Sequence, residues 1–228
     1  VGSASIFKMD LNGVVTTPYL LKPPIQRRWA YLAATGTSST VLGDISTTTG
    51  TVAFNEIVSP ETTYATAATT GSNAGTIGNL IWDRQHSPRF QFRGYNFSTA
   101  NRRVWYGLTS VSLATQVGSD SPAASYAAFR ASTDAGDGNW QACTKDGTTA
   151  TCIDTGVAVS TVIFDFEIIL DGSVPNAIFK INGAVVATAT TNLPGAATQL
   201  AAMVGQQTRA NAAKTIGLNW LYVETSNN

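Results

Sequence analysis

The chain has 228 residues, of which 43% are hydrophobic and 12% charged, and its 14 Lys and Arg residues balance 14 Asp and Glu residues. This balance argues against nucleic-acid binding, which normally shows as a basic patch or a strongly basic domain. No run reaches the ~18 to 20 apolar residues of a membrane span, so we expect neither a nucleic-acid nor a membrane partner. The first ten residues lack the basic start and apolar centre of a secretory signal, and we expect a chain that is mature or made without one.

Residues 1–28 differ from the rest of the chain, because they combine Pro18, Pro23 and Pro24 with scattered apolar side chains. Proline removes a backbone donor and excludes a continuous helix or a central strand. The pattern predicts an extended N-terminal arm. We expect it to pack through five side chains, either on another polypeptide or as an edge strand on its own domain: Phe7, Leu11, Tyr19, Leu20 and Leu21.

Residues 29–228 are predicted to form one β-domain, because short β-like runs alternate with turn residues from Trp29 onward. Many short strands at such spacing are typical of a sandwich or barrel. The last run, 216–224, is apolar on nearly both faces, which favours a position inside a sheet. The best helical candidate is 197–203, limited to about two turns by Gly205. The other expected strands are 29–34, 51–58, 63–70, 77–83, 89–97, 102–111, 124–132, 139–144 and 151–157.

The clearest local prediction covers 162–187, where apolar residues alternate from Val162 to Leu170, the period of a half-buried strand. A turn follows at 171–176. A second strand then reverses at Asn182-Gly183, the dipeptide best suited to a two-residue hairpin. This hairpin would pair residue 181 with 184, 180 with 185, and 179 with 186.

The two cysteines, Cys143 and Cys152, flank the sequence KDGTTA. A four-residue loop from Asp146 to Thr149 would place them directly opposite each other on antiparallel strands, close to disulfide distance. A three-residue loop would break that register. Two reduced core cysteines remain an equal alternative, because two cysteines do not fix a redox compartment.

Several segments between Arg89 and Glu224 carry a likeness to a known family: RFQFRGYNF, VWYGLTS, AAFRASTDAGDGNW, DTGV, FDFEIILDGS, FKINGAVVATATTNLP and IGLNWLYVE. This part of the chain, about its last three-fifths, resembles the concanavalin A-like (laminin-G-like) jelly-roll domains of bacteriophage structural proteins. The resemblance implies an all-β fold, an antiparallel jelly-roll β-sandwich of two packed sheets, and a role on a virion or in glycan contact. Composition and spacing by themselves indicate only the β-rich content.

Paired carboxylates on one strand would be needed for glycan cleavage. Asp165 and Glu167 share a strand face, with Asp171 beyond them. Hydrolases of the resembled fold carry Glu-x-Asp-x-x-Glu, whereas this chain has Asp-x-Glu-x-x-x-Asp, so we expect exposed structural carboxylates and no enzyme.

The loop at 134–140 is the candidate for cation or glycan contact. Asp134, Asp137 and Asn139 offer oxygen ligands, and Trp140 offers a ring for a sugar. A loop role needs only Asx and Gly turn chemistry, and a hard cation takes six to eight oxygens, so we expect no metal and no cofactor. His86 has no second His or Cys nearby and is interpreted as a loop residue.

These observations predict a non-enzymatic virion protein, either a capsid decoration or cement protein or a fibre or spike component. Its expected location is the extracellular particle. Its expected partners are other virion proteins, further copies of itself and, as an open alternative, a surface glycan. The different-class alternative is a secreted carbohydrate-binding, lectin-like module, with a glycan hydrolase third.

Overall fold

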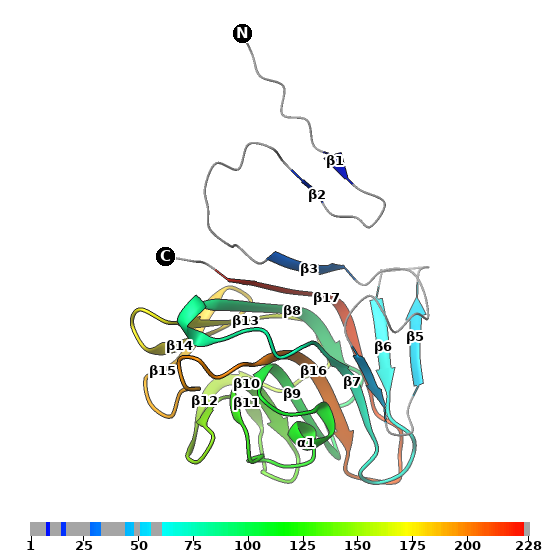
Figure 1. Cartoon of the computed structure of the whole chain (residues 1–228). Helices are drawn as coiled ribbons and strands as arrows, with labels where there is room; N and C mark the ends of the chain where they lie inside the picture. Colours follow the sequence, from blue (N-terminus) through cyan, green and yellow to red (C-terminus); the bar gives the residue numbers. More distant parts are fainter. Residues whose placement is uncertain are drawn as a thin grey trace.

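The computed structural model describes residues 61–225 together with five short strands at 8–9, 15–16, 28–32, 44–47 and 51–55. Two antiparallel sheets pack face to face into a jelly-roll sandwich (Figure 1), as the sequence predicts. Side chains are described for Thr51 and residues 62–225.

The eight-stranded sheet has the order β15 (Ala184–Ala189), β14 (Asn176–Ile181), β13 (Phe164–Asp171), β8 (Pro88–Asn96), β17 (Thr215–Thr225), β6 (Glu61–Ala65) and β5 (Thr51–Asn55), with β3 (Arg28–Leu32) also paired to β17. The seven-stranded sheet has the order β12 (Ala150–Ala158), β11 (Asn139–Asp146), β10 (Ser125–Ser132), β9 (Arg102–Thr109), β16 (Ala201–Thr208), β7 (Asn73–Ile77) and β4 (Asp44–Thr47). Within the described residues, two short helices, η1 (Arg84–His86) and α1 (Leu113–Val117), lie in the connections.

The main core lies between the sheets, where alternate residues of each strand point inward. Four aromatic rings from both sheets meet at its centre. Tyr106 lies 4.6 Å from Phe92 and 5.4 Å from Trp140, and Trp140 lies 4.8 Å from Phe166, measured between ring centroids. Pairs of rings at this spacing stabilise a core beyond their buried area.

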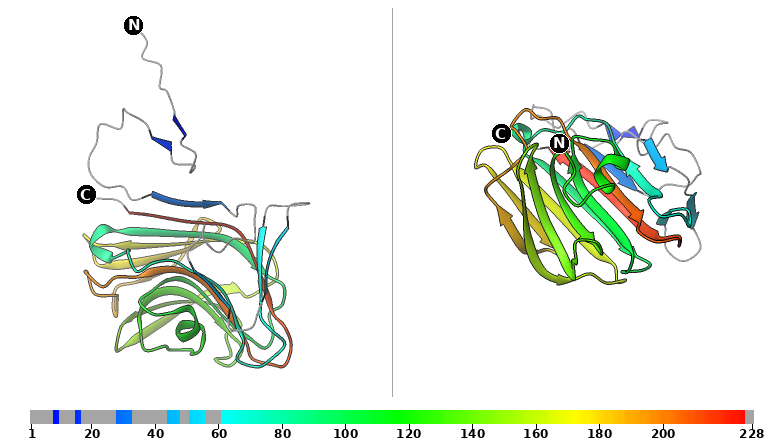
Figure 2. Two further views of the ribbon diagram at one scale, coloured as in Figure 1. Left: turned by 45° about the vertical axis from the view of Figure 1, so that its right-hand side comes forward. Right: turned by 90° about the horizontal axis from the view of Figure 1, so that it is seen from below.

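A second apolar cluster covers the outer face of the seven-stranded sheet, where α1 packs on β9, β16 and β7 (Figures 1 and 2). Its centre is formed by Trp105, Leu113, Val117 and Met203. The chain makes room for the helix with Gly205 on β16, where an added Cβ would lie 2.9 Å from a Leu113 methyl carbon. Strand β9 is therefore buried on both faces.

The stretch 162–187 largely follows its predicted structure. In β13 the inward residues Phe164 to Leu170 are buried in alternation, although the strand begins two residues after Val162. The hairpin at Asn182-Gly183 is confirmed, with φ of 51° and 79°, and residues 181 and 180 pair with 184 and 185. Phe179, however, pairs with Ala187 and not with Val186, because a β-bulge adds one residue to β15.

Three further expectations can be compared with the structure. The position of 216–224 inside a sheet is confirmed, since β17 has β8 on one side and β3 and β6 on the other. The helix predicted at 197–203 is wrong, because β16 occupies 201–208 and pairing on both edges overrides local helix propensity. The strand predicted at 77–83 is also wrong: β7 ends at Ile77, and the following residues connect the two sheets with a single bridge, Trp82 to Leu200.

Little of the proposed N-terminal arm falls within the described residues. There, β1 (Lys8–Met9) pairs with β2 (Val15–Thr16), and Arg28 begins β3. The expected anchors Phe7, Leu11, Tyr19, Leu20 and Leu21 lie outside them. The arm and its boundary with the sandwich at 28/29 therefore stay predictions. In the described part of the chain, no helix has the length and apolar character needed to cross a bilayer.

Candidate functional site

The four residues predicted for cation or glycan contact do not converge in the structure. Asp137 accepts hydrogen bonds from Arg130 Nε at 2.9 Å and Nη2 at 3.0 Å, and from the Ser132 backbone N–H. Asp134 accepts from Arg209 Nε at 2.6 Å, whereas the Asn139 amide donates to Asp154 at 3.0 Å. Across the described part of the chain, no group of three or more His, Cys, Asp or Glu could hold a metal ion.

The expectation that Trp140 is available to stack on a sugar is wrong. Its side chain is fully buried in the core between the sheets. Alternate residues of β11 face the core, so Trp140 and Ala142 point inward while Gln141 points outward. The loop composition suggested a ring beside Asp137, but Asp137 lies in the loop before β11 and is bound by Arg130, whereas Trp140 points into the core.

A polar cluster of three cations and one tryptophan lies on the outer face of the seven-stranded sheet. It holds residues 117–122, which we call the strap, against β9, β10 and β11. Four side chains from these strands donate to four strap carbonyls: Arg103 to Val117 at 3.2 Å, Trp105 to Ser119 at 3.2 Å, Arg130 to Asp120 at 2.8 Å and Lys145 to Pro122 at 2.9 Å.

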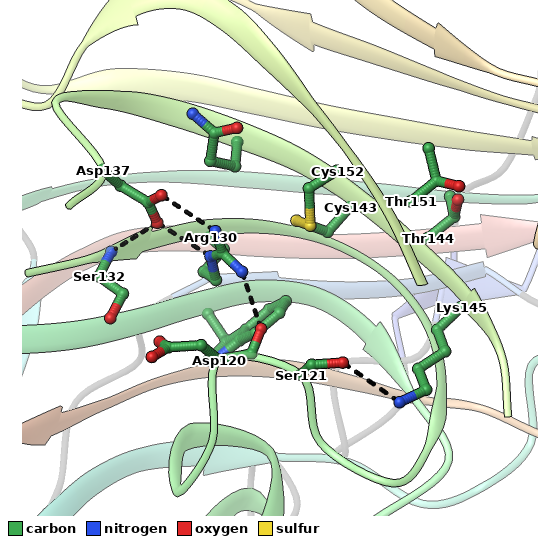
Figure 3. The surroundings of a disulfide bond; sticks show 12 residues. Asp120, Ser121, Arg130, Ser132, Asp137, Cys143, Thr144, Lys145, Thr151 and Cys152 are labelled. Atoms are coloured by element: carbon green, nitrogen blue, oxygen red, sulfur yellow. Dashed lines mark hydrogen bonds and ion pairs between the residues drawn. A yellow bond between two sulfur atoms is a disulfide. The ribbon is translucent and has the colours of Figure 1, made fainter. Parts of the chain in front are cut away.

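Figure 3 shows the part of this cluster around Arg130 and Lys145. The guanidinium of Arg130 joins Asp137 to the Asp120 carbonyl and lies 5.9 Å from the Trp105 ring, a cation–π arrangement. Lys145 is buried and also donates to the Ser121 hydroxyl. These side chains donate their hydrogen bonds to oxygens of the same chain, and the cluster therefore holds the strap in place.

Asp120 gives the strap its own charged contact, because its carboxylate pairs with Arg103 on β9. Burial is the largest influence on the pKa of Asp120 and by itself would raise it. The hydrogen bond from Arg103, with the charges of Arg103 and Arg130, outweighs burial and holds the pKa below its usual value. The strap is therefore best held when Asp120 is ionised.

The two cysteines lie beside this cluster (Figure 3) and form a disulfide between β11 and β12. The register is the one predicted for a four-residue loop, with Lys145 opposite Ala150 and Cys143 opposite Cys152. Cys143 is buried in the outer apolar cluster that includes Trp105 and Met203, and Cys152 is exposed on the edge strand β12. The bond thus fastens the outermost strand of the sheet to its neighbour.

The carboxylates of β13 lie on the outer face of the eight-stranded sheet, opposite the core. Asp165 pairs with Arg93 at 2.9 Å. Glu167 accepts from Arg89 at 2.7 Å and lies 3.4 Å from Lys180, and its side chain is only 12% exposed. The expectation of an exposed carboxylate is therefore wrong for Glu167, because cations on both neighbouring strands cover it.

Asp171 and His86 have local structural roles. Asp171 accepts from the backbone N–H groups of Ser173 and Val174, and these bonds, that from Val174 first, lower its pKa. His86 is half-exposed in η1, where its Nδ1 contacts Asp83, the N-cap of that helix. Both arrangements organise a turn.

Sequence reasoning missed the strap, and one signal could have found it. Arg130 stands inside the apolar run YAAFRAS on a strand whose neighbours are buried. A buried strand seldom carries a charge unless a partner and hydrogen bonds are supplied. The partners come from 117–122 and from Asp137, and no local pattern indicates that 117–122 crosses this face.

Comparisons with known proteins give structural likeness only. No protein-family model matches the chain, and no curated protein matches it. A solved protein of unknown function from Shewanella oneidensis MR-1 is similar with a TM-score of 0.61 at 12% identity, covering 88% of this chain and 86% of that one.

Two further structures show the range of proteins that share the fold. The carbohydrate recognition domain of Emp46p, in its potassium-bound form, has a TM-score of 0.59 at 7% identity, covering 86% of this chain and 95% of that one. A Bacillus licheniformis β-glucanase has a TM-score of 0.56 at 9% identity, covering 88% and 98%. The fold is thus the concanavalin A-like jelly roll found in both lectin-like domains and glucanases. At these identities the likeness fixes the fold and leaves function to the residues.

Proposed function

We propose that this chain is a non-enzymatic structural protein that acts by protein–protein assembly, and that the assembly is a bacteriophage particle. Its place there is on the capsid, as a decoration or cement protein, or in a fibre or spike. The proposal rests on two observations. Residues 89–224 resemble phage jelly-roll domains, and the carboxylates between residues 62 and 225 are all bound by structural partners.

The observation that carries the non-enzymatic part is that each of the ten carboxylates between residues 62 and 225 has a structural partner. Six are bound by Arg or Lys: Asp120, Asp134, Asp137, Asp165, Glu167 and Glu224. Four accept bonds from local backbone N–H groups: Asp83, Asp146, Asp154 and Asp171.

Glycan hydrolysis needs one carboxyl group held protonated as the acid and a second carboxylate close to the bond that breaks. Bound cations and backbone donors favour the charged form, which is the opposite of what a general acid requires. The described carboxylates therefore suit fixed structural contacts and give no support to hydrolysis.

The particle proposal is tested by imaging and mass spectrometry of purified virions. We expect the chain at a fixed copy number per particle and gold-labelled antibody at one defined position. Particles that lack the chain altogether would overturn the proposal.

A carbohydrate-binding module is the second candidate, favoured by the likeness to the Emp46p carbohydrate recognition domain. A glycan array probed with the isolated chain separates the two candidates. Specific glycan binding combined with no affinity for particles would favour the lectin-like function, whereas particle binding without glycan binding favours assembly.

A further inference from the structure

Aromatic side chains gather on the outer face of the eight-stranded sheet, the side of the sandwich away from α1 (Figure 1). On β8 and β17, which are neighbours in this sheet, the core residues Phe92 and Leu221 point inward. Tyr95 and Trp220 therefore point outward, because side chains alternate along a strand, and both are partly exposed. Phe97 follows directly after β8 and is 50% exposed.

Two of these rings form a continuous surface. The ring centroids of Tyr95 and Phe97 are 4.8 Å apart, and the ring planes are tilted by 39°. Gly217 of β17 lies opposite Tyr95, and a Cβ added at this glycine would lie 2.5 Å from Cε1 of the tyrosine. The Tyr95 ring therefore lies across β17, in the space that the glycine leaves open.

Arg93 connects these two rings with Trp220. It lies two residues before Tyr95 on the same face of β8, opposite Trp220 on β17 and opposite Asp165 on β13. Residues directly opposite each other on antiparallel strands have Cβ atoms about 4.5 to 5.5 Å apart. The five residues Arg93, Tyr95, Phe97, Asp165 and Trp220 are therefore contiguous, and we call them the platform.

The ion pair of the platform supplies hydrogen-bonding groups without a net charge. Arg93 Nη1 donates to both carboxylate oxygens of Asp165, at 3.0 and 2.9 Å. Among the described residues, no acceptor is bonded to Nε or Nη2 of Arg93. The two side chains are 43% and 41% exposed. Hydroxyl groups of a ligand can therefore reach both charges.

We propose that the platform binds an uncharged polysaccharide. One face of a pyranose ring presents C–H groups, which pack on aromatic rings. The hydroxyl groups at the rim of the sugar both donate and accept hydrogen bonds. On the platform, the three aromatic rings contact the C–H faces of the sugars, and Arg93 and Asp165 bond to the hydroxyl groups.

The exposed ion pair favours a sugar over a protein as the occupant. A protein surface that covered Arg93 and Asp165 would remove water from both charges, at a cost that only new, well-placed hydrogen bonds offset. Sugar hydroxyls supply such bonds to a guanidinium and to a carboxylate alike. The paired charges also provide no field that would attract an acidic polymer, so the occupant is neutral. This inference adds a ligand to the proposed assembly role and does not depend on it.

Affinity electrophoresis of the full chain tests the platform, in native gels that contain dextran, mixed-linkage β-glucan or galactomannan, with alginate as the acidic probe. We expect at least one neutral polymer to slow the chain and alginate to leave its mobility unchanged. Trp220→Ala and Phe97→Ala should each weaken binding about three- to tenfold. The matched control is Val174→Ala, which shortens a side chain that is 61% exposed at the β13–β14 turn; its affinity should equal that of the parent chain.

Tryptophan fluorescence gives a second readout at the platform itself. Of the four tryptophans whose side chains are described, Trp82, Trp105 and Trp140 are buried and Trp220 is partly exposed. A sugar on Trp220 replaces water there, so the emission should shift to shorter wavelength when the bound polymer is added. Trp220→Phe keeps an aromatic ring, and it should retain most of the affinity while it loses the shift.

Gly217→Ala tests the placement of the Tyr95 ring. The added methyl group displaces the ring but leaves all five platform residues in the chain. We expect this variant to bind the polymer about threefold more weakly than the parent chain.

Three results would overturn the proposal. They are a mobility that none of the three neutral polymers changes, retardation by alginate alone, and a spectral shift that persists in Trp220→Phe. Particle binding by a chain that binds no polymer would leave the proposed function standing and reject this inference alone. Circular dichroism and the melting temperature establish that each variant is folded, and Phe97→Ala, at an exposed side chain, serves as the test if Trp220→Ala does not fold.

Discussion

Leu113 of α1 packs directly on Gly205 of β16, and a Cβ added at position 205 would lie 2.9 Å from its Cδ1 atom. The helix can approach the outer face of the seven-stranded sheet only because this position has no side chain. We predict that Gly205→Ala lowers the free energy of unfolding by about 1 to 3 kcal/mol, the usual cost of overpacking. Urea denaturation measures the change. Gly138→Ala is the matched control, because its added methyl meets nothing within 4 Å, and a shift as large in the control would contradict the explanation.

Stability should fall in acid partly through Asp120, whose pKa in the folded protein is below its usual value. A lowered folded pKa contributes stability above the unfolded value, about 3.9, and that contribution is lost as the pH drops through the folded pKa. The melting temperature, followed from pH 6 to pH 2, should fall more steeply below about pH 4 in the parent chain than in Asp120→Asn. Parallel curves would show that the contact between Asp120 and Arg103 does not respond to protonation.

The disulfide between Cys143 and Cys152 closes a short loop, with nine positions separating the two cysteines. The chain-entropy relation for a loop of this size gives about 2 to 3 kcal/mol. We expect the double variant Cys143→Ala, Cys152→Ala to lose about that much free energy of unfolding under oxidising conditions. Dithiothreitol should lower the free energy of unfolding of the parent chain by a similar amount, and it should leave that of the variant unchanged.

Trp140 should affect stability without affecting any glycan contact at the surface. Because its indole is fully buried against Tyr106 and Phe166, we expect Trp140→Ala to cost about 3 to 5 kcal/mol. Phe97→Ala, at a side chain that is 50% exposed, should change stability by less than about 0.5 kcal/mol. Equal costs for the two substitutions would contradict the placement of Trp140 in the core.

The parts of the fold that sequence predicts well are those specified by neighbouring residues. The alternation in 164–170, the hairpin at Asn182-Gly183 and the opposition of Cys143 and Cys152 each follow from a local period or a turn geometry. The failures depend on distant partners. Residues 201–208 are rich in helix formers, but they form a strand because they pair with β9 along one edge and with β7 along the other.

The polar contacts on the outer face of the seven-stranded sheet were harder to predict, because they also depend on distant partners. Asp134, Asp137 and Asn139 are neighbours in sequence, but each has a different partner, drawn from three different strands or loops. The four side chains that donate hydrogen bonds to the strap lie between Arg103 and Lys145 in the sequence. They come together only because β9, β10 and β11 are adjacent in the sheet. The α1 signals were present, since Ser112 and Gly118 flank the helix as N-cap and C-cap, but five residues give too little periodicity to stand out.

Strand β17 has a consequence for how the domain is made. It pairs with β8 along one edge and with β6 and β3 along the other, so it joins three segments that are far apart in the chain. It is also the last strand of the sandwich in chain order. During synthesis the edges of β8 and β6 that pair with β17 stay unpaired until residues 215–225 emerge from the ribosome. Until then these edges can pair with other chains. Completion of the eight-stranded sheet is therefore a late step in the folding of this domain.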